Sequence, residues 1–600
     1  MFESKIYINS NEAIAWGAMA SGVDLVAHYP GSPVNLVETH IKKLNDRFQG
    51  QVKFNDSLNE HVAALSAAGA SYCGARSMVI MKHVGLNIAA DPLNYIGYTG
   101  VKGGMVIIVG TDPGANSSTG EEDVHWFVPQ FNFPLFEPTS VQECYDFTKK
   151  AYEISEKYEI PVMLFVPGRL AYNYSTVEVA LVEQEAKPTF YFEKDKERYI
   201  NVGQQAVKNH KLLLEKVELI GKKESSCKSH FNADAKHGIL VRGLSYSMTR
   251  ELIEKHDLQD QVHLLNVDLV FPLNENDLGS FIVGKEVITV IEDQDGFLEN
   301  QLKMNFFNSL KCSIHGKDIF PKHGEITINQ IEGYFEETFD IQIIENTLLT
   351  VPEIPERLGT FCEGCPHTGS YYSIDSVLKE MNGVIGGDIG CSSLAPFRAD
   401  WLMCMNAGIG VSQGMAQVLT DQPVISTGGD GSFFHAGALS LMSAVQNDIN
   451  LIHMVFDNST IAMTGHQTSP SEGDFDHRKF LEGMGVKTII DVSPYDPKDF
   501  IQKFKEELPK KGVRVFWVKG ACVLKGNDFI ESRRNVIYPT IDPTKCGSCS
   551  KCYEDLACPA IINLKQAPDQ ELEIDLDRCV RCGLCNEICP NGAISIQDMI

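Results

Sequence analysis

The chain has 600 residues, 43% hydrophobic and 22% charged, which is ordinary for a globular protein and long enough for several domains. Its 52 basic and 79 acidic residues give a formal net charge of -27, which repels nucleic-acid backbones and anionic lipid surfaces, so neither is an expected partner. The longest apolar runs fall far short of the roughly 20 residues that cross a bilayer, and neither a signal peptide nor a secreted disulfide framework is evident, so we expect a cytoplasmic protein with no membrane association.

Residues 1–178 alternate helical and strand-like stretches, which predicts a doubly wound α/β domain. Asn9 and Glu12 have the spacing of a capping box, and a helix is expected from Asn9 to Gly22. The further elements expected here are strands at Val23–Tyr29, Met105–Val109 and Val162–Val166, and helices at Val62–Tyr72 and Val141–Lys157.

Glu60 begins an Ala-rich helix after the strand-like residues Gln51 to Phe54, a place from which its carboxyl group can face a cleft. Ser57 and Glu60 also have capping-box spacing, which would give Glu60 only a structural role. The residues by themselves leave both interpretations open.

Residues 179–235 are rich in charge and predict a connector, with a helix from Gln204 to Leu219 and a polar loop from Glu224 to Ala235. Residues 236–350 predict a small α/β domain. The elements expected in it are strands at Gly238–Val241, Val262–Asn266 and Val287–Ile291 and a helix at Phe297–Ser309.

Residues 355–535 predict a third α/β domain, which contains the run Gly428-Gly429-Asp430-Gly431-Ser432. A strand is expected before this run, at Pro423–Thr427, a helix after it, at Phe434–Gln446, and a second strand at Leu451–Phe456. Glycines let backbone amides come close to a diphosphate, and the start of the following helix adds its positive end. This unit therefore predicts a diphosphate-binding edge, although Gly-Asp-Gly alone is also an ordinary turn.

Two side chains at this edge have the chemistry of magnesium ligands. Asp430 follows one strand and Asn458 follows the next, so both are expected at the carboxyl edge of a parallel sheet. Mg²⁺ prefers an octahedron of hard oxygen ligands, and the backbone carbonyl of Thr460 is the third protein donor that we predict.

The C-terminal segment, 540–600, contains eight cysteines in two similar repeats. The second repeat has the bacterial ferredoxin spacing, in which three close thiolates hold one 4Fe-4S cube and a fourth cysteine crosses to the other cube; the first repeat has a longer final spacer. Zinc is the alternative, but zinc ligands usually come as two spaced pairs. We predict two 4Fe-4S clusters in a small ferredoxin-like α+β domain, one held by Cys546, Cys549, Cys552 and Cys589, the other by Cys579, Cys582, Cys585 and Cys558.

Several of these runs resemble one family of thiamine diphosphate enzymes. Gly-Asp-Gly followed by Asn after 26 intervening residues resembles the thiamine diphosphate signature of transketolase-like enzymes. The run Asp457–Gln467 is similar to the large (alpha) subunit of indolepyruvate ferredoxin oxidoreductases, and Met81–Leu93 and Tyr98–Gly104 resemble the pyrimidine-binding domain of the same enzymes. The resemblance implies two doubly wound thiamine-diphosphate-binding domains and makes 236–350 a domain like the C-terminal domain of transketolases.

The resemblance also implies roles for particular residues. Glu60 falls on the glutamate that serves the pyrimidine ring of the cofactor, which favours a catalytic over a capping role. Ser32, in the turn Tyr29–Pro33, is a candidate substrate contact by the same resemblance, and an ordinary turn is the alternative. From their charge alone, Lys82 and His83 are further candidates to bind a carboxylate, and a solvated or structural role is the alternative. The residues that would bind the diphosphate and its Mg²⁺ are Gly429, Asp430, Gly431, Ser432, Asn458 and Thr460.

A third iron–sulfur cluster is a further hypothesis. The wider 2-oxoacid:ferredoxin oxidoreductase superfamily holds a cluster beside thiamine with a Cys-x-x-Cys pair and two later cysteines. Buried free thiols remain the equal alternative, because one pair is a weak metal signal. The matching ligands would be Cys362, Cys365, Cys391 and Cys522.

As a member of that family, the chain would decarboxylate aryl 2-oxoacids such as indolepyruvate or phenylpyruvate with coenzyme A, giving arylacetyl-CoA and CO₂, and pass electrons through 4Fe-4S clusters to ferredoxin. The resemblance implies a smaller (beta) subunit as partner, in a heterodimer or higher hetero-oligomer. One alternative is the same chemistry on pyruvate or branched-chain 2-oxoacids. Another is a non-catalytic electron-transfer subunit, against which the intact Glu60, Asp430 and Asn458 argue.

Overall fold

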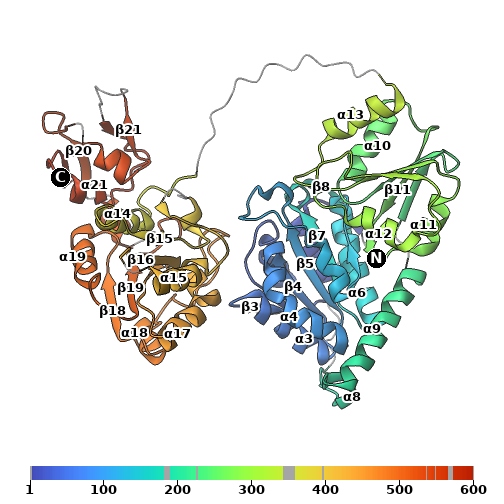
Figure 1. Ribbon diagram of the computed structural model, residues 1–600, viewed down its shortest axis with the longest axis horizontal. Helices are drawn as coiled ribbons and strands as arrows, with labels where there is room; N and C mark the ends of the chain where they lie inside the picture. The colour runs from blue at the N-terminus through green and yellow to red at the C-terminus, as the bar shows by residue number, and fades with distance from the viewer. Residues whose placement is uncertain are drawn as a thin grey trace. The chain divides into compact units, whose positions relative to one another are not determined.

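The computed structural model divides the chain into two compact units, Met1–Thr350 and Val351–Ile600, which are described one at a time (Figure 1). The domain boundary expected at 350–355 lies outside the described residues. Among the described residues, no helix is long and apolar enough to cross a membrane. The structure describes residues 3–180, 189–224, 227–341, 359–394, 398–419, 421–526, 528–534, 537–547, 549–564 and 572–598.

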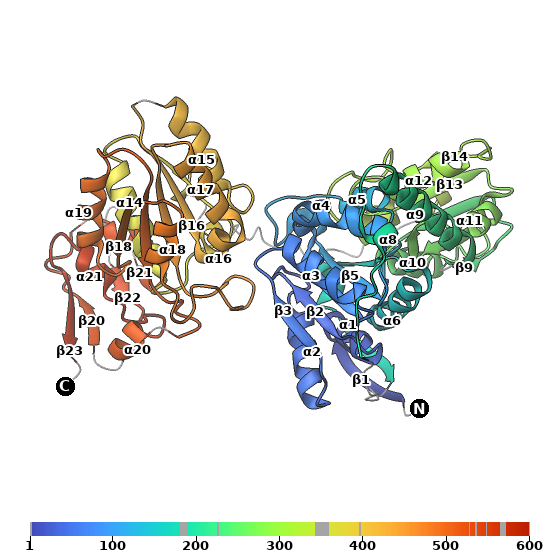
Figure 2. The same cartoon turned by 90° about the horizontal axis from the view of Figure 1, so that it is seen from below.

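The first unit is built on a seven-stranded sheet with the order β12-β6-β7-β5-β4-β2-β3, in which only β12 is antiparallel to its neighbour. Helices α1 (Ser10–Ala20), α2 (Leu36–Arg47) and α6 (Val141–Tyr158) cover one face, and α3 (Glu60–Tyr72) and α4 (His83–Thr99) cover the other (Figure 2). The strands are β2 (Leu25–His28), β3 (Lys53–Asp56), β4 (Ser77–Lys82), β5 (Met105–Thr111), β6 (Leu135–Phe136), β7 (Val162–Pro167) and β12 (Leu269–Phe271).

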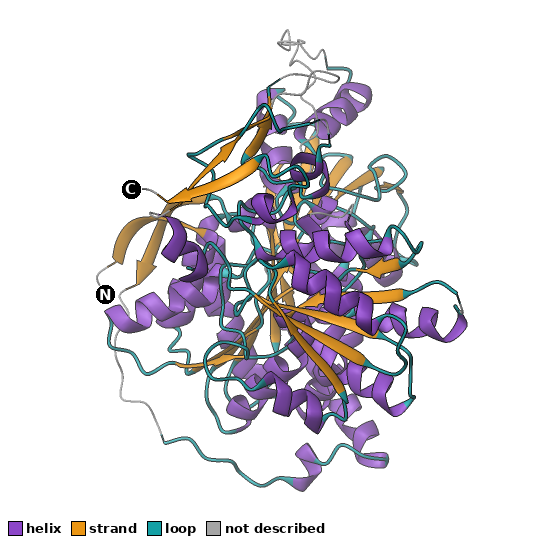
Figure 3. Cartoon of the chain, turned by 90° about the vertical axis from the view of Figure 1, so that its left-hand side faces the viewer, coloured by secondary structure: helices purple, strands orange, loops and turns teal. Residues whose placement is uncertain are grey.

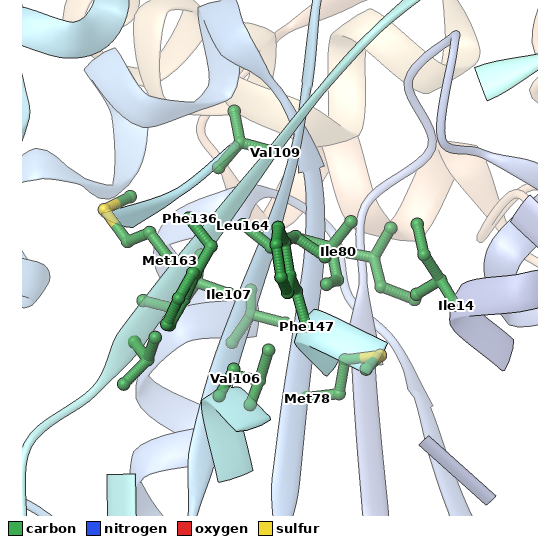
Figure 4. Packing of buried hydrophobic residues seen from close by; sticks show 14 of the residues in the cluster. Ile14, Met78, Ile80, Val106, Ile107, Val109, Phe136, Phe147, Met163 and Leu164 are labelled. Carbon is green, nitrogen blue, oxygen red and sulfur yellow. The ribbon is translucent and has the colours of Figure 1, made fainter. Parts of the chain in front are cut away.

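The central strands are almost continuously apolar because both faces of a parallel sheet are buried under helices. Phe136 and Phe147 pack among these strands, and Ile14 of α1 lies beside them (Figure 4). Figure 3 marks the helices and strands of the chain by colour. The strand residues labelled in this core are Met78, Ile80, Val106, Ile107, Val109, Met163 and Leu164.

Two pairs of residues have capping-box spacing in the sequence, and the box expected at Asn9 and Glu12 is confirmed. Asn9 caps α1, since its side chain accepts from Glu12 N at 3.0 Å and its own N–H donates to Glu12 Oε2 at 3.0 Å. The box of Ser57 with Glu60 is wrong, because Asn59 is the cap and accepts from the backbone N–H of the third helical residue at 3.0 Å. Glu60 is therefore the first residue of α3, with a side chain that makes no capping box.

The second sheet of this unit has five strands in the order β14-β13-β10-β11-β9. The expected helix is confirmed as α9 (Gln204–Lys223), but the polar loop expected after it is wrong where it covers β9 (Cys227–Phe231). β9 is an antiparallel edge strand with half-exposed polar side chains, so its sequence lacks the alternation of apolar and polar residues that indicates a strand. Residues 225–226 of the expected loop lie outside the described residues. The other strands are β10 (His237–Val241), β11 (Val262–Val267), β13 (Val287–Ile291) and β14 (Ser313–His315).

The second unit contains a parallel sheet with the order β15-β16-β17-β19-β18. Helices α14 (Pro366–Leu378) and α19 (Pro497–Glu507) lie on one face, and α15 (Ala407–Val418) and α17 (Ala438–Gln446) on the other (Figure 2). Helical structure after β16 begins at Asp430, four residues before the expected start. The strands are β15 (Val384–Gly386), β16 (Val424–Gly429), β17 (Ile452–Asp457), β18 (Thr488–Val492) and β19 (Arg514–Lys519).

The C-terminal segment forms a small α+β fold that packs on this unit. Strand β20 (Ile537–Ile541) pairs with β23 (Ile594–Asp598), and β21 (Ile561–Asn563) pairs with β22 (Leu572–Ile574). Its helix α21 (Leu584–Ile588) contacts α19, and its core includes Tyr372 of α14. The segment is therefore docked on the sheet domain through a shared apolar cluster.

Candidate functional site

Four strand ends of the second unit meet at one edge of its sheet. Asp388 follows β15, Asp430 follows β16, Asn458 follows β17 and Cys522 follows β19. Because these strands are parallel neighbours, their carboxyl ends converge, which is where open α/β sheets bind ligands. A Cβ added to Gly429 would meet no atom within 4 Å, so this edge leaves room for a ligand against the backbone.

The carboxylates of Asp388 and Asp430 at this edge are buried. Asp430 is 1% exposed and accepts hydrogen bonds from Ser469 and, at 2.7 Å, from Ser471. Burial and the nearby charge of Asp457 raise the pKa of Asp430 to about 6, and burial raises that of Asp388 to about 7. A divalent cation would reverse these shifts by favouring the charged forms, so the donor set fits Mg²⁺.

The loop after β17 holds Asn458 in place. Its side-chain oxygen accepts from the backbone N–H of Thr460 at 3.1 Å, and its carbonyl accepts from Cys522 N at 3.2 Å. Asp457 accepts from Trp517 Nε1 at 2.9 Å. The magnesium donors expected at Asn458 and Thr460 thus lie on a fixed loop that is tied directly to a cysteine.

The four cysteines of the third-cluster hypothesis lie together, and we call them the Cys362 set: Cys362, Cys365, Cys391 and Cys522. Burial raises the pKa of Cys365, and the charges of the other three thiols raise it further. Burial likewise raises the pKa of Cys391 to about 12, with further contributions from Cys522, Cys362 and Asp430. The structure therefore places this set beside the acidic edge of the sheet.

The eight C-terminal cysteines line two cavities, grouped as the sequence predicts. One cavity is lined by the Cys558 set, and the other is lined by the Cys546 set. Each set takes one cysteine from the other repeat, as the crossing pattern of bacterial ferredoxins requires. The Cys558 set is Cys558, Cys579, Cys582 and Cys585; the Cys546 set is Cys546, Cys549, Cys552 and Cys589.

The spacing of the sulfurs does not suit zinc. Within the described ranges, one group of three candidate ligand atoms lies within 4.8 Å of one another, namely His28, Glu38 and Asp56. No three cysteine sulfurs of the described residues meet that limit, whereas Zn–S bonds of about 2.3 Å put sulfurs about 3.8 Å apart.

In the first unit, the side chain of Glu60 is buried in a close-fitting site. The side chain is 5% exposed and packs against the start of α4. A Cβ added to Gly85 would lie 2.6 Å from Glu60 Oε1, so only glycine leaves room for this carboxyl group. A carboxyl group buried in this way fits an aminopyrimidine partner better than a solvated cap.

The candidate substrate contacts gather at the carboxyl ends of β2 and β4. A Cβ on Gly31 would lie 2.5 Å from Lys82 Cβ, so the turn that contains Ser32 touches Lys82. Lys82 donates to the Ser117 carbonyl at 2.6 Å, and burial lowers the pKa of Lys82 and of His83. Neither basic side chain is therefore simply solvated.

The sequence analysis missed several members of these sites. Asp388 lies in the run Gly387–Cys391, of which only Cys391 was predicted to bind a cofactor. Ser469 and Ser471 donate hydrogen bonds to Asp430 from a loop without a recognisable sequence motif, so the sequence alone does not indicate their role. Gly85 was part of the matched run Met81–Leu93, but its contact with Glu60 is visible only in the fold.

Comparisons with known proteins match three parts of the chain. Residues 16–233 match "Pyruvate flavodoxin/ferredoxin oxidoreductase, thiamine diP-bdg", residues 388–518 match "Thiamine pyrophosphate enzyme, C-terminal TPP binding domain", and residues 572–595 match "4Fe-4S binding domain". The chain is 32% identical over 616 positions to "Indolepyruvate oxidoreductase subunit IorA" of Archaeoglobus fulgidus, covering 98% of this chain and 97% of that one. The protein of the same name from Methanothermobacter thermautotrophicus is 32% identical over 619 positions, with the same coverage.

The chain belongs to the indolepyruvate oxidoreductase subunit IorA family. It is a thiamine-diphosphate-dependent 2-oxoacid:ferredoxin oxidoreductase with an iron–sulfur domain, and the predicted family and fold class are confirmed. A solved 2-oxoglutarate:ferredoxin oxidoreductase from Magnetococcus marinus has a TM-score of 0.47 and 16% identity, covering 56% of this IorA-family chain and 65% of that chain.

Proposed function

We propose that this IorA-family chain oxidatively decarboxylates aryl 2-oxoacids of the indolepyruvate and phenylpyruvate type with coenzyme A, and that the products are an arylacetyl-CoA and CO₂. The printed names of its relatives support the substrate class. The observation that carries the proposal is the bond from Cys522 N to the Asn458 carbonyl, because it joins a four-cysteine set to the diphosphate-binding edge. A redox centre beside a thiamine site is what an electron-releasing decarboxylation requires.

Each unit has residues with the chemistry to bind one part of thiamine diphosphate. Asp430, Asn458 and the Thr460 carbonyl would bind Mg²⁺, while Gly429 and Gly431 admit the diphosphate and the buried Ser432 lies on the same helical turn. When bound, thiamine diphosphate supplies a thiazolium that accepts the electron pair left behind as CO₂ departs. Glu60 would share a proton with the pyrimidine nitrogen, which keeps the aminopyrimidine able to take up the thiazolium proton.

Three cysteine sets would then receive the electrons. We assign one 4Fe-4S cluster to each of the Cys362, Cys558 and Cys546 sets, because each has four thiols in one place and no zinc-like spacing. Ferredoxin would be the external acceptor, taking one electron at a time. The relatives are named as subunits, which supports a partner chain, and a smaller beta subunit would complete a hetero-oligomer.

The substrate carboxylate would meet the group of Ser32, Lys82 and His83. Lys82 carries the positive charge that a carboxylate needs, and Ser32 lies in the turn beside it. Partial burial of Lys82 strengthens such an ion pair, because the surrounding dielectric constant is lower than in water. These three assignments rest on the shared position of the residues at the end of β2 and β4.

The test compares Glu60→Gln with Asn59→Ala in the purified complex. Glu60→Gln keeps the size of the side chain but cannot supply a carboxylate, so hydrogen–deuterium exchange at the thiazolium carbon, followed by NMR, should collapse while stability is kept. Asn59→Ala removes the observed cap, so it should cost about 1 kcal/mol of stability and leave exchange unchanged. Exchange near the wild-type rate in Glu60→Gln would refute the catalytic assignment. Turnover with indolepyruvate, phenylpyruvate, pyruvate and a branched-chain oxoacid tests the substrate class.

A further inference from the structure

The C-terminal iron–sulfur segment touches the loop that carries two cysteines of the Cys362 set. Arg578 donates to Glu363 Oε1 through Nε at 2.9 Å and through its terminal nitrogen at 2.6 Å. Glu363 and Gly364, which lie between Cys362 and Cys365, also line the cavity of the Cys558 set. The loop is therefore shared between two cysteine sets.

Gly364 makes this contact close. Its φ of +72° is rarely adopted by other residues, and a Cβ here would lie 2.2 Å from Val580 Cγ2. The same Cβ would lie 3.6 Å from the Cβ of Cys582, which belongs to the Cys558 set. The Gly364 carbonyl accepts a hydrogen bond from Tyr495 OH at 2.9 Å, which helps to hold the loop in place. Only glycine lets the two cysteine-bearing loops approach this far.

Among the residues that the structure describes, the Cys546 set has no such neighbour. Its cavity is lined solely by residues between Ile541 and Ile594, with none from the Cys362 loop. Cys549 of this set is exposed, whereas no cysteine of the Cys558 set is. The Cys558 set thus adjoins the Cys362 set, whereas the Cys546 set contains the one exposed cysteine of the two C-terminal sets, Cys549.

We propose that Gly364, with the ion pair of Glu363 and Arg578, is a positioning device for electron transfer between the Cys362 set and the Cys558 set. The inference rests on the cluster assignments of the proposed function and adds a positioning role for residues that bind no cluster themselves. The two electrons released per oxoacid pass singly from the Cys362 set to the Cys558 set and then to the Cys546 set. Two molecules of a one-electron acceptor such as ferredoxin leave reduced for each oxoacid oxidised.

The main test is Gly364→Ala, which forces the two loops apart. Val580→Ala in the same chain should rescue it, since no other atom of Val580 is among the contacts within 3.6 Å. The matched control is Gly512→Ala, because Gly512 has a φ of +89° but nothing within 4 Å of an added Cβ. This control carries the backbone strain without the clash.

Three measurements on the full complex separate the outcomes: iron content, the EPR spectrum after dithionite reduction, and anaerobic stopped-flow bleaching of the clusters after oxoacid and coenzyme A are added. Gly364→Ala should keep its iron, lose magnetic coupling between neighbouring clusters and bleach severalfold more slowly. The rescue variant and the Gly512 control should bleach as wild type does.

A second variant, Arg578→Gln, leaves the cysteine loops free of any clash. It removes a partly exposed ion pair, so a smaller slowing in the same direction is expected. The control is Lys498→Gln, which breaks another ion pair of the docked segment, Lys498 with Glu587 of α21 at 3.0 Å, and leaves the contact between Glu363 and Arg578 intact. Wild-type bleaching in Gly364→Ala with full iron would overturn the positioning role alone. Wild-type protein without iron in the Cys362 set would overturn the proposed function as well.

Discussion

A buried ionic network joins the two sheets of the first unit, and its removal has a predictable cost. Arg242 follows β10 of the second sheet and is 5% exposed. It donates to Glu137, after β6 of the first sheet, at 2.7 and 2.8 Å, and to Glu292, after β13, at 2.9 Å. The perturbation is Arg242→Gln, which removes the charge and leaves two buried carboxylates.

The structure sets the size of the effect. Removing one partner of a buried ion pair typically costs about 3–5 kcal/mol. Glu292 keeps hydrogen bonds from Leu298 N and Glu299 N at 2.8 and 2.9 Å, and Glu137 keeps His125 Nε2 at 2.7 Å. Because each carboxylate retains a partner, the low end, about 3 kcal/mol, is expected. At about 2 °C per kcal/mol for a large domain, the melting midpoint should fall by about 6 °C.

The assay is urea unfolding and differential scanning calorimetry of the full chain, in which the first unit should lose stability and the second should not. The control is Arg250→Gln, which breaks an exposed pair with Glu254 on α10 (Ser245–Lys255) and should cost under about 0.5 kcal/mol. If the two variants unfold alike, the network does not hold the two sheets together and the reasoning fails.

Three further predictions follow from single residues. Burial and Arg242 oppose the charge on His125, but Asp123 and Glu137 outweigh them and raise its pKa to about 9. The folded pKa exceeds the unfolded value of about 6.5, so the stability that protonated His125 contributes is complete below about pH 6.5 and is lost as the pH rises through about 9. In His125→Gln, the melting midpoint measured by calorimetry should therefore fall less over this pH range. Asp430→Ala should abolish magnesium-dependent thiamine binding in calorimetric titration without lowering the melting midpoint; unchanged affinity would refute the ligand role. Cys522→Ser should lower iron from about twelve to about eight atoms per chain, and unchanged iron would exclude it as a ligand.

The sequence by itself determined the parts of the protein that depend on local patterns. Cysteine spacing predicted both C-terminal sets, including the exchange of Cys558 and Cys589 between repeats, because cluster geometry requires fixed intervals along the chain. Asp430 and Asn458 were predicted because strand ends in a parallel sheet converge, whatever the loops between them do. Buried apolar strands such as β5 and β7 were equally evident, since parallel strands must be hydrophobic on both faces.

Tertiary structure decided what depends on contacts between distant segments. The capping residue of α3 is Asn59 because its side chain reaches the helix N–H groups, which the spacing of Ser57 and Glu60 did not reveal. Strand β12 joins the first sheet from a segment that continues the second, and Arg242 links both sheets. The approach of Gly364 to Val580, more than 200 residues apart, follows from no local pattern, because close packing is selected by the shape of the folded chain and not by sequence period.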